Sequence, residues 1–600
     1  MLDKRKFYIN GQWVEPSKKN DFNVINPSDE TVCAVISLGS QEDTNAAVNA
    51  AREALPSWSN SSKEDRVALL ERLYSIYERR MDEMAEVISI EMGAPIDFAK
   101  AAQAPSGTSA IEDFLNQLRK FEFEEQLDDS DNQLLYEPKG VCALITPWNW
   151  PISQVALKVI PAIAAGCTMV LKPSEIAPLD SMIFAEMLEE AGCPAGVFNL
   201  VNGDGAGVGS QLTSHSDIDM VSFTGSTRAG ALISHNAADD FKRVGLELGG
   251  KGANIIFADA DEKAVKRGVR HCFNNTGQSC NAPTRMLVER SFYDKAVEIA
   301  KETALSTKTD VASKGGKHLG PVVSQLQFDK IQALIQAGID ENATLVTGGV
   351  GKPDGLETGY FIKPTIFADV NNQMTVARTE IFGPVLAMIP FDSEEEAIEI
   401  ANDTPYGLTN YVQTQDPARA KRMSKKLLSG TVELNGKGAA SGAPFGGFKH
   451  SGIGREGGEH GFNESIEVKR VTGGVGKPDG LETGYFIKPT IFADVNNQMT
   501  VARTEIFGPV LAMIPFDSEE EAIEIANDTP YGLTNYVQTQ DPARAKRMSK
   551  KLLSGTVELN GKSAASGAPF GGFKHSGIGR EGGEHGFNEY IEVKVVTGWN

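Results

Sequence analysis

The chain has 600 residues, of which 41% are hydrophobic and 23% charged, an ordinary globular composition with room for several domains. The formal net charge of -22 predicts an acidic surface that repels nucleic acid and anionic lipid, so neither partner is expected. The six cysteines form no CxxC pair and no Cys/His cluster, which argues against a metal site and a disulfide framework and for a reducing compartment. No apolar run is long enough for a signal sequence or a membrane span, and a cytoplasmic protein is expected.

The first third of the chain alternates helix-like and strand-like segments. Apolar residues recur at helical spacing in Gln41–Trp58 and Lys63–Met92. The charged stretch Leu118–Leu135 fits either a protruding hairpin or a linker.

Short apolar runs then alternate with a further helix. Strands are expected within Gly140–Ile145, Ala164–Leu171 and Val197–Val201, and a helix over Leu179–Ala191. Strands that alternate with helices predict a parallel sheet with crossover helices, and therefore an α/β fold.

Three turns near strand ends suit a phosphate-rich ligand. Val201–Gly209 and Phe223–Ser226 are glycine turns in which the backbone can approach a pyrophosphate. Lys172 and Glu175 follow a strand and can bracket ribose hydroxyls. Taken singly, each glycine turn fits an ordinary loop equally well, and Lys172 and Glu175 fit a solvated loop with a chance ion pair better.

Two further segments carry reactive side chains. Cys280 ends the small, polar run Asn274–Cys280, where exposure and a thiolate are more plausible than in an apolar core. Glu247 precedes a flexible glycine turn that ends at Lys251. Alone, the cysteine also fits inert packing, and the glutamate a solvated surface.

The largest organisational feature is a tandem repeat. Val346–Arg470, called copy one below, recurs as Val471–Val595, called copy two, at an offset of 125 residues. The copies differ at three positions: Gly438 against Ser563, Ser465 against Tyr590, and Arg470 against Val595. The period is too long and the identity too high for a solenoid, so a recent duplication or an assembly accident is the expected cause.

Together the motifs resemble one family. Their order and spacing are similar to those of the NAD(P)-dependent aldehyde dehydrogenase superfamily, in its hydrolytic branch, over the whole chain once the repeat is counted once. The motifs are Ile145-Thr-Pro-Trp148-Asn149-Trp150-Pro151, Lys172-Pro-Ser-Glu175, Phe223-Thr-Gly-Ser226, Glu247-Leu-Gly-Gly-Lys251, Gly277-Gln-Ser-Cys280, Glu380-Ile-Phe-Gly-Pro384 and Pro444-Phe-Gly-Gly-Phe-Lys449, with Ser451-Gly452 close behind.

The resemblance implies a thioester mechanism. It makes Cys280 the nucleophile, Glu247 the base that activates water, and Asn149 a donor to the oxyanion. Lys158 would assist proton transfer, although it also fits a solvated helix face. Because the branch that transfers the acyl group to coenzyme A typically lacks the glutamate, Glu247 favours a free carboxylate product.

The same match assigns NAD-binding residues. Lys172 and Glu175 would hold the adenosine ribose, and like-charge repulsion between Glu175 and a 2′-phosphate favours NAD over NADP. Glu380 and Phe382 would position the nicotinamide ribose and ring. The full set expected to bind cofactor is Thr146, Trp148, Lys172, Ser174, Glu175, Gly205, Gly209, Phe223, Gly225, Ser226, Leu248, Glu380 and Phe382.

The substrate and the assembly are less sharply implied. The pocket positions Trp150, Gln154, Gln278, Ser279 and Asn281 suggest a hydrophobic tunnel and a broad-range aliphatic or aromatic aldehyde, with a semialdehyde as the alternative. A homodimer or homotetramer is expected. A cofactor-binding structural protein, or a pseudoenzyme damaged by the duplication, is the competing class.

The expected architecture is a Rossmann-like cofactor domain, an α/β catalytic domain and a small β oligomerisation element. The cofactor domain is placed at 1–120 and 141–246, the oligomerisation element at 121–140 plus a C-terminal strand, and the catalytic domain at 247–445. Copy two is expected to be an extra partial catalytic lobe.

Three arrangements of the copies are open: copy one builds the lobe, copy two builds it, or the two share it. Copy one is preferred at the active site, because it follows Leu345 without a gap. The tail of copy two, Asn588–Val596, is expected to form the better final strand.

Overall fold

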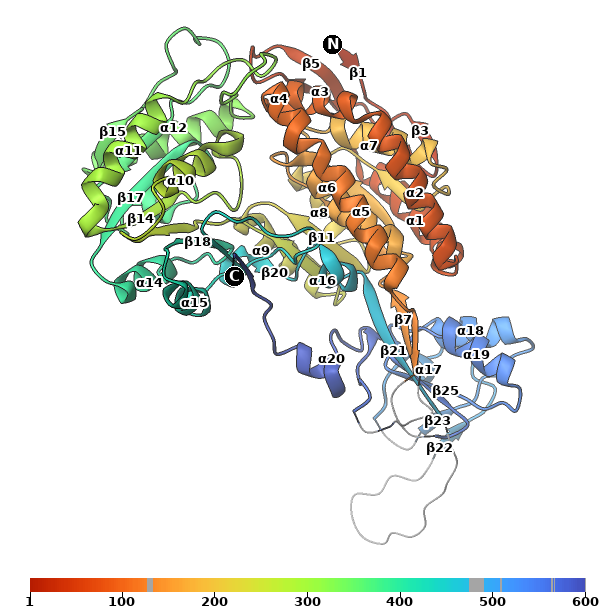
Figure 1. The fold of residues 1–600 in the computed structure, drawn as a ribbon. Coiled ribbons are helices and arrows are strands. Elements are labelled where there is room, and N and C mark those ends of the chain that lie inside the picture. Colours follow the sequence, from red (N-terminus) through yellow and green to blue (C-terminus); the bar gives the residue numbers. More distant parts are fainter. Residues whose placement is uncertain (127–132, 474–489, 508–509, 563–564, 566, 599–600) are drawn as a thin grey trace.

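The structure, a computed structural model, describes residues 1–126, 133–473, 490–507, 510–562, 565 and 567–598 (Figure 1). Two eight-stranded sheets and one five-stranded sheet contain most of the strands in these residues. A small sheet of order β1-β5-β4 borders the N-terminus and consists of Leu2–Asp3, Val32–Ser37 and Asp21–Ile25. Within the described part of the chain, no helix is both long and apolar enough to cross a bilayer.

The first eight-stranded sheet, called the cofactor sheet, has the order β20-β12-β11-β8-β9-β10-β2-β3. Its five central strands are mutually parallel, and antiparallel strands flank them on both sides. In the order given, the strands are Gly452–Ile453, Arg243–Glu247, Met220–Thr224, Val141–Ile145, Thr168–Lys172, Phe198–Leu200, Phe7–Ile9 and Gln12–Val14. The parallel sheet expected from the alternating pattern is therefore present.

Helices cover both faces of the cofactor sheet. Ser40 and Ser62 begin two of them with capping boxes, in which each serine accepts a backbone N–H and an aspartate returns the bond. The helical run Lys63–Met92 is divided at Arg80 into α2 and α3. The helices are α1 Gln41–Ser59, α2 Lys63–Arg79, α3 Met81–Met92, α4 Ile96–Phe98, α5 Pro105–Lys120, α6 Pro151–Ala165, α7 Leu179–Glu190, α8 Ser210–Thr213 and α9 Thr227–Ala238.

The second eight-stranded sheet, the catalytic sheet, has the order β15-β16-β17-β14-β13-β18-β19-β28 and is parallel except for β15. Neighbouring residues such as Ile255 and Ile256 enter separate apolar clusters, because successive strand side chains point to opposite faces. In that order its strands are Thr344–Thr347, Thr365–Ala368, Val385–Phe391, Arg285–Glu289, Ala253–Ile256, Thr409–Gln413, Thr431–Leu434 and Val595–Thr597. The surrounding helices are α10 Ala264–Phe273, α11 Tyr293–Leu305, α12 Gln325–Asp340, α13 Thr375–Arg378, α14 Glu394–Asn402 and α15 Pro417–Lys426. Helix α16, Gly458–Asn463, packs instead against α5 and α6 of the cofactor domain.

The five-stranded sheet joins the charged stretch after α5 to both copies of the repeat. Strands β6, Glu124–Gln126, and β7, Gln133–Pro138, pair antiparallel, which fits the hairpin alternative for this stretch. Strand β21, Ile466–Gly473, pairs with β7 on one side and with β26, Thr556–Leu559, on the other. Strand β25, Thr534–Val537, completes the sheet beside β26.

Copy two forms only part of a catalytic lobe. It lacks counterparts of β13 and β14, the strands that lie in copy one's sheet between β17 and β18. Its strand pair β22–β23 is therefore separate from β25–β26, and Phe507 is 95% exposed. The elements outside the five-stranded sheet are β22 Thr490–Phe492, α17 Thr500–Arg503, β23 Val510–Ala512, α18 Glu519–Asn527, β24 Tyr531–Gly532, α19 Pro542–Lys551, β27 Phe573–Lys574 and α20 Gly583–Asn588.

The prediction that copy two has the better final strand is wrong. Strand β21 of copy one is eight residues long, whereas β28 of copy two is three residues long. The number of paired neighbours decides this difference, since β21 pairs on both sides and β28 pairs with β19 alone.

Candidate active site

The predicted site residues converge because five parallel strands end at the same edge of the cofactor sheet. Ligands of open α/β sheets bind at this carboxyl edge, where the strand order reverses around β8. Thr146–Trp148 follow β8, Lys172–Glu175 end and follow β9, Gly203–Gly209 follow β10, Gly225–Ser226 follow β11, and Glu247–Leu248 end and follow β12.

Cys280 lies in a tightly constrained loop after α10. Asn275, Thr276 and Gly277 all have positive φ angles, of 52°, 56° and 74°. A Cβ at Gly277 would lie 2.2 Å from the carbonyl of Gly383, so only glycine allows this approach. Copy one therefore packs directly against the cysteine loop.

The surroundings of Cys280 raise the pKa of its thiol above its ordinary value. Burial raises the pKa of the thiol, and the charges of Glu380 and Glu247 raise it further. In this conformation the polar setting therefore does not lower the pKa of the thiol, first because the sulfur is buried and then because two carboxylates act on it.

Glu247 is buried at the end of β12, with 4% of its surface exposed. Neither carboxylate oxygen has a hydrogen-bond partner among the described residues. Burial raises the pKa of this carboxyl well above its usual range, and the negative charge of Glu456 adds to the effect. The lone pairs of Glu247 are therefore free to accept a proton from a water molecule.

Asn149 is held by a network of amides. Its Nδ2 donates to the carbonyl of Gln278 at 3.0 Å, and its own carbonyl accepts from Gln103 and Asn275 at 3.2 and 2.9 Å. An amide nitrogen has two hydrogens, so one N–H of Asn149 remains for an oxyanion. Trp150, the next residue in the chain, donates from Nε1 to Ser279 Oγ at 2.9 Å and so also stabilises the cysteine loop.

Lys158 is buried and donates to Thr224 Oγ1 at 2.8 Å and to Glu456 Oε1. Its alternative reading as a solvated helix residue is therefore wrong. A small cavity of about 30 Å³ is lined by Lys158, Glu247 and Glu456 together. Glu456 was missed in the sequence, because it belongs to no motif there and only the fold brings it to Lys158.

The turns after β9 and β10 fit an adenosine ribose and a pyrophosphate. Lys172 Nζ donates to the carbonyls of Gly203 and Pro173 at 2.5 and 2.8 Å and lies 3.5 Å from Glu175 Oε2. Asp204 Oδ1 accepts from the N–H of Gly207 at 2.6 Å, which fixes the turn. A Cβ at Gly205 would meet only open space, so a ligand can approach the backbone there.

The turn after β11 presents a second helix N-terminus. Ser226 caps α9, whose first N–H groups suit an anion, and the ring of Phe223 would lie 2.4 Å from a Cβ at Gly225. The remaining predicted residues contact this framework. Thr146 donates its N–H to the carbonyl of Lys172, Ser174 Oγ accepts from Ile176 N, Gly209 donates its N–H to Asp204, and Leu248 packs over Gly230.

Copy one supplies the residues predicted at the nicotinamide. Glu380 Oε1 accepts the N–H of Gly250 at 2.9 Å, and Phe382 packs edge-on against Trp148 with ring centroids 5.4 Å apart. Phe382 has a φ of 60°, a conformation that bulky residues rarely adopt. Their counterparts in copy two, Glu505 and Phe507, are exposed.

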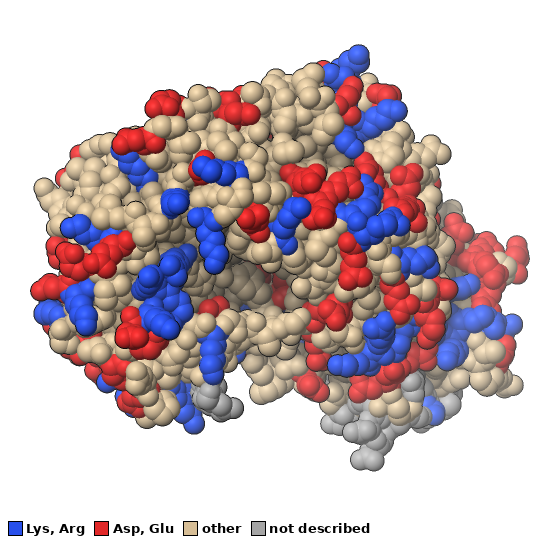
Figure 2. All heavy atoms as spheres, turned by 45° about the horizontal axis from the view of Figure 1, so that its top comes forward, with Lys and Arg blue, Asp and Glu red and all other residues tan. Residues whose placement is uncertain are grey.

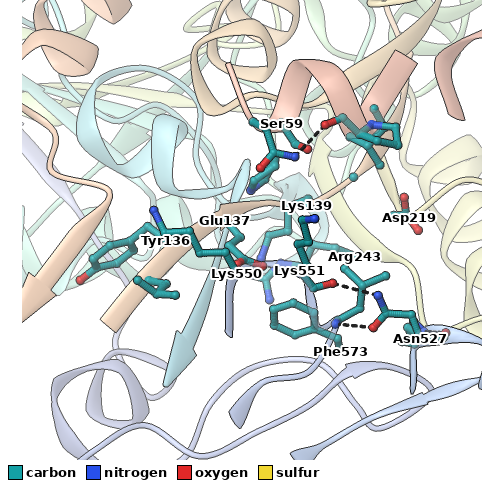
Figure 3. Close-up of a pocket in the computed structure, with 18 of the residues that line it drawn as sticks. Ser59, Tyr136, Glu137, Lys139, Asp219, Arg243, Asn527, Lys550, Lys551 and Phe573 are labelled. Atoms are coloured by element: carbon teal, nitrogen blue, oxygen red, sulfur yellow. Dashed lines mark hydrogen bonds between the residues drawn. The ribbon is translucent and has the colours of Figure 1, made fainter. Parts of the chain in front are cut away.

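The face shown in Figure 2 carries acidic and basic side chains side by side and is hollowed near its middle. A second cavity, of about 1490 Å³, lies between copy two and the segments around α1, α2 and β7. Figure 3 shows Lys139, Arg243, Lys551 and Phe573 among the residues that line it. It contains none of the predicted site residues. Within the described residues, no cluster of three metal-ligating side chains occurs.

Known proteins share this architecture. A crystal structure of an aldehyde dehydrogenase from Bartonella henselae matches with a TM-score of 0.78 and 57% identity, covering 78% of this chain and 99% of that one. A mutant of aldehyde dehydrogenase C from Pseudomonas syringae, complexed with NAD+ and octanal, matches with a TM-score of 0.77 and 46% identity, covering 78% and 96%.

Sequence relatives match over the same length. A 3-succinoylsemialdehyde-pyridine dehydrogenase from a Pseudomonas species is 51% identical over 475 residues, which are 79% of this chain and 99% of the relative. The uncovered fifth of the chain has the length of one repeat copy. The family model for the aldehyde dehydrogenase family matches residues 13–471 and again 469–596. The chain therefore belongs to the aldehyde dehydrogenase family, whose members oxidise aldehydes with a nicotinamide cofactor.

Proposed function

We propose that this chain oxidises an aldehyde to a free carboxylate through a thioester on Cys280, which Glu247 hydrolyses. The observation that carries the proposal is the packing of the Glu247–Lys251 turn on the cysteine loop, where a Cβ at Gly250 would lie 2.4 Å from the carbonyl of Cys280. The Glu247 carboxylate is buried and has no hydrogen-bond partner among the described residues. A nucleophile and a general base in one buried site are what acyl transfer to water requires.

The chain's own groups account for the steps at the substrate. The Cys280 sulfur, once deprotonated, adds to the aldehyde carbon, and the oxyanion accepts hydrogen bonds from the free N–H of Asn149 and the backbone N–H of Cys280. Bound NAD supplies the acceptor for the hydride that leaves this carbon. Glu247 then takes a proton from water, whose oxygen displaces the sulfur and releases the carboxylate.

Lys158 and Glu456 provide the route by which the proton leaves Glu247. The three side chains line one cavity, and Lys158 is bonded to Glu456 and Thr224. A paired and buried lysine is well placed to pass charge toward the surface.

NAD is the proposed cofactor in preference to NADP. Glu175 lies beside Lys172 at the end of β9, where the adenosine ribose is expected. Its carboxylate repels a 2′-phosphate, which Lys172 offsets only in part because that amine already donates to two backbone carbonyls.

The proposed substrate is a broad-range aliphatic or aromatic aldehyde. Phe98 and Trp150 form an edge-on aromatic pair, with ring centroids 5.7 Å apart, next to Ser279. An apolar wall of this kind suits a hydrophobic chain or ring. The similarity to a dehydrogenase named for a pyridine semialdehyde keeps a semialdehyde as the second candidate.

The predicted domain division and the cytoplasmic location remain part of the proposal. A homodimer or homotetramer, expected from the resemblance, would need a surface other than the β19 edge of the catalytic sheet, because β28 already pairs with β19.

Single-turnover kinetics test the mechanism. With NAD and octanal, Glu247→Gln is expected to release about one equivalent of NADH in a burst and then stall, since acylation precedes the water step. Cys280→Ser is expected to give no burst, and Glu581→Gln, the same change of side chain at an exposed residue of copy two, serves as a control with unchanged kinetics. An aldehyde panel with succinic semialdehyde ranks the substrates, and NAD binding without turnover on any aldehyde would establish a pseudoenzyme instead.

A further inference from the structure

The two copies of the repeat exchange their final strands. Strand β21, at the end of copy one, pairs in parallel with β26 of copy two, and β28, at the end of copy two, pairs in parallel with β19 of copy one. Figure 1 shows the C-terminal segment running from α20 back to the catalytic sheet beside β18 and α15. Neither tail pairs with the lobe of its own copy.

The two pairings have the same register. Arg470, Val471 and Thr472 lie opposite Thr556, Val557 and Glu558. Adding 125 to the first set gives Val595, Val596 and Thr597, which lie opposite Thr431, Val432 and Glu433, the second set less 125. The pairing of β28 with β19 thus repeats, residue by residue, the pairing of β21 with β26.

A reciprocal contact of this kind is the mark of a twofold interface between identical subunits, in which residue i meets j and j meets i. Here both halves of the contact lie in one chain. With a single copy, the β19 edge and the outer edge of β21 would both be unpaired, and each would complement the other in a second chain.

Side-chain contacts also hold the segment that leads into β28, residues 592–596, against copy one. Arg455 Nη2 donates to Glu592 Oε2 and to the carbonyl of Val593 at 2.8 and 3.0 Å. Lys594 Nζ donates to the carbonyl of Ser424 at 3.2 Å, and Val596 packs against the apolar cluster of the catalytic sheet.

We propose that copy two is a tethered pseudo-subunit that occupies, within the chain, the surface on which a second copy of the chain would otherwise pair. A tethered partner is present at an effective concentration of roughly millimolar, far above that of a separate chain. The strand-exchange surface is therefore closed to other molecules, and the chain does not dimerise through it.

Paired cysteines in the full chain test the proposal without any use of activity. Val432 and Val596 are register partners, and neighbouring strands place Cα atoms within reach of a disulfide or a short bis-maleimide. V432C/V596C is expected to form a bridge inside one chain, at the 64.5 kDa mass of a single chain on a non-reducing gel. Peptide mapping is expected to join the two segments.

The control pair is V432C/V471C, which would bridge only if the tail of copy one paired with a β19 strand. It is expected to give no bridge, and each single variant controls for the six native cysteines. A covalent dimer from V432C/V596C, a bridge in V432C/V471C, or no bridge in folded V432C/V596C would each overturn the proposal.

Discussion

Glu456 is the residue that most changes the expected chemistry of Glu247. Its charge raises the pKa of Glu247, second only to burial, and the same carboxylate binds Lys158. The two motifs recognised in the sequence, around Glu247 and Cys280, are thus completed by a side chain from the repeat.

The raised pKa predicts a pH dependence. Glu247 acts as a base only when ionised, so the thioester-hydrolysis rate is expected to rise with pH through a pKa well above about 4.3. Removing the Glu456 charge by Glu456→Gln is expected to shift this limb of the kcat profile to lower pH. The counterpart Glu581→Gln is expected to leave the limb in place, and an unmoved limb in Glu456→Gln would contradict the assignment.

Glu175 carries a second residue-scale prediction. Glu175→Ser is expected to raise kcat/KM for NADP relative to NAD by about tenfold, because it removes roughly 1.4 kcal/mol of like-charge repulsion. Steady-state kinetics with both cofactors measure the ratio, with Glu175→Asp as the charge-conserving control. A lower KM for NADP than for NAD in the unmodified enzyme would refute the stated preference.

At the scale of elements, the loop before β17 belongs to the site and its repeat does not. Gly277 packs on Gly383 without room for a side chain, whereas Phe507 of the second copy is 95% exposed. The same residues thus pack against the cysteine loop in one copy and form an open loop in the other. The neighbours supplied by residues 247–345 make the difference.

Glu380→Gln and Glu505→Gln separate the two copies by experiment. Only Glu380→Gln is expected to raise the KM for NAD and lower kcat, by about tenfold or more, because only Glu380 is bonded to Gly250. NADH production with saturating aldehyde reports both constants. An effect confined to Glu505→Gln would mean that copy two completes the site.

At the scale of the whole molecule, copy two covers two strand edges but exposes apolar side chains of its own. Leu511 and Phe516 are exposed, while their counterparts Leu386 and Phe391 are buried. Phe507 is also exposed, whereas its counterpart Phe382 is half-buried. Copy two therefore covers the strand edges on which another subunit could pair, but its own core is incomplete and leaves apolar side chains exposed.

Deleting residues 471–595 tests whether copy two covers a surface on which two chains would otherwise pair. The remaining 475-residue chain has the length over which the Pseudomonas relative aligns, and its β19 and β21 edges lose their partners. Light scattering is expected to show a homodimer for the deletion and a single 64.5 kDa chain for the full protein, if no other surface pairs. Binding of a hydrophobic dye is expected to fall, and a monomeric deletion variant would count against the exchange.

The sequence by itself determined the family and the turns that follow the parallel strands, and it supplied Cys280 and Glu247 as the proposed nucleophile and base. These features are local: each motif sits at a strand end or a helix start, and strand order brings such ends together. The break at Arg80 between α2 and α3 did not appear as a boundary, because apolar spacing continues across it.

Only the tertiary structure decided how the identical copies divide their roles. Glu456 reaches Lys158, and Val595–Thr597 reaches β19, through contacts between segments that no spacing relates. Two nearly identical sequences carry the same propensities, so their different structures must come from their neighbours. Copy one adds its strands to β13 and β14, which precede it in the chain, and copy two has only strand edges on which to dock.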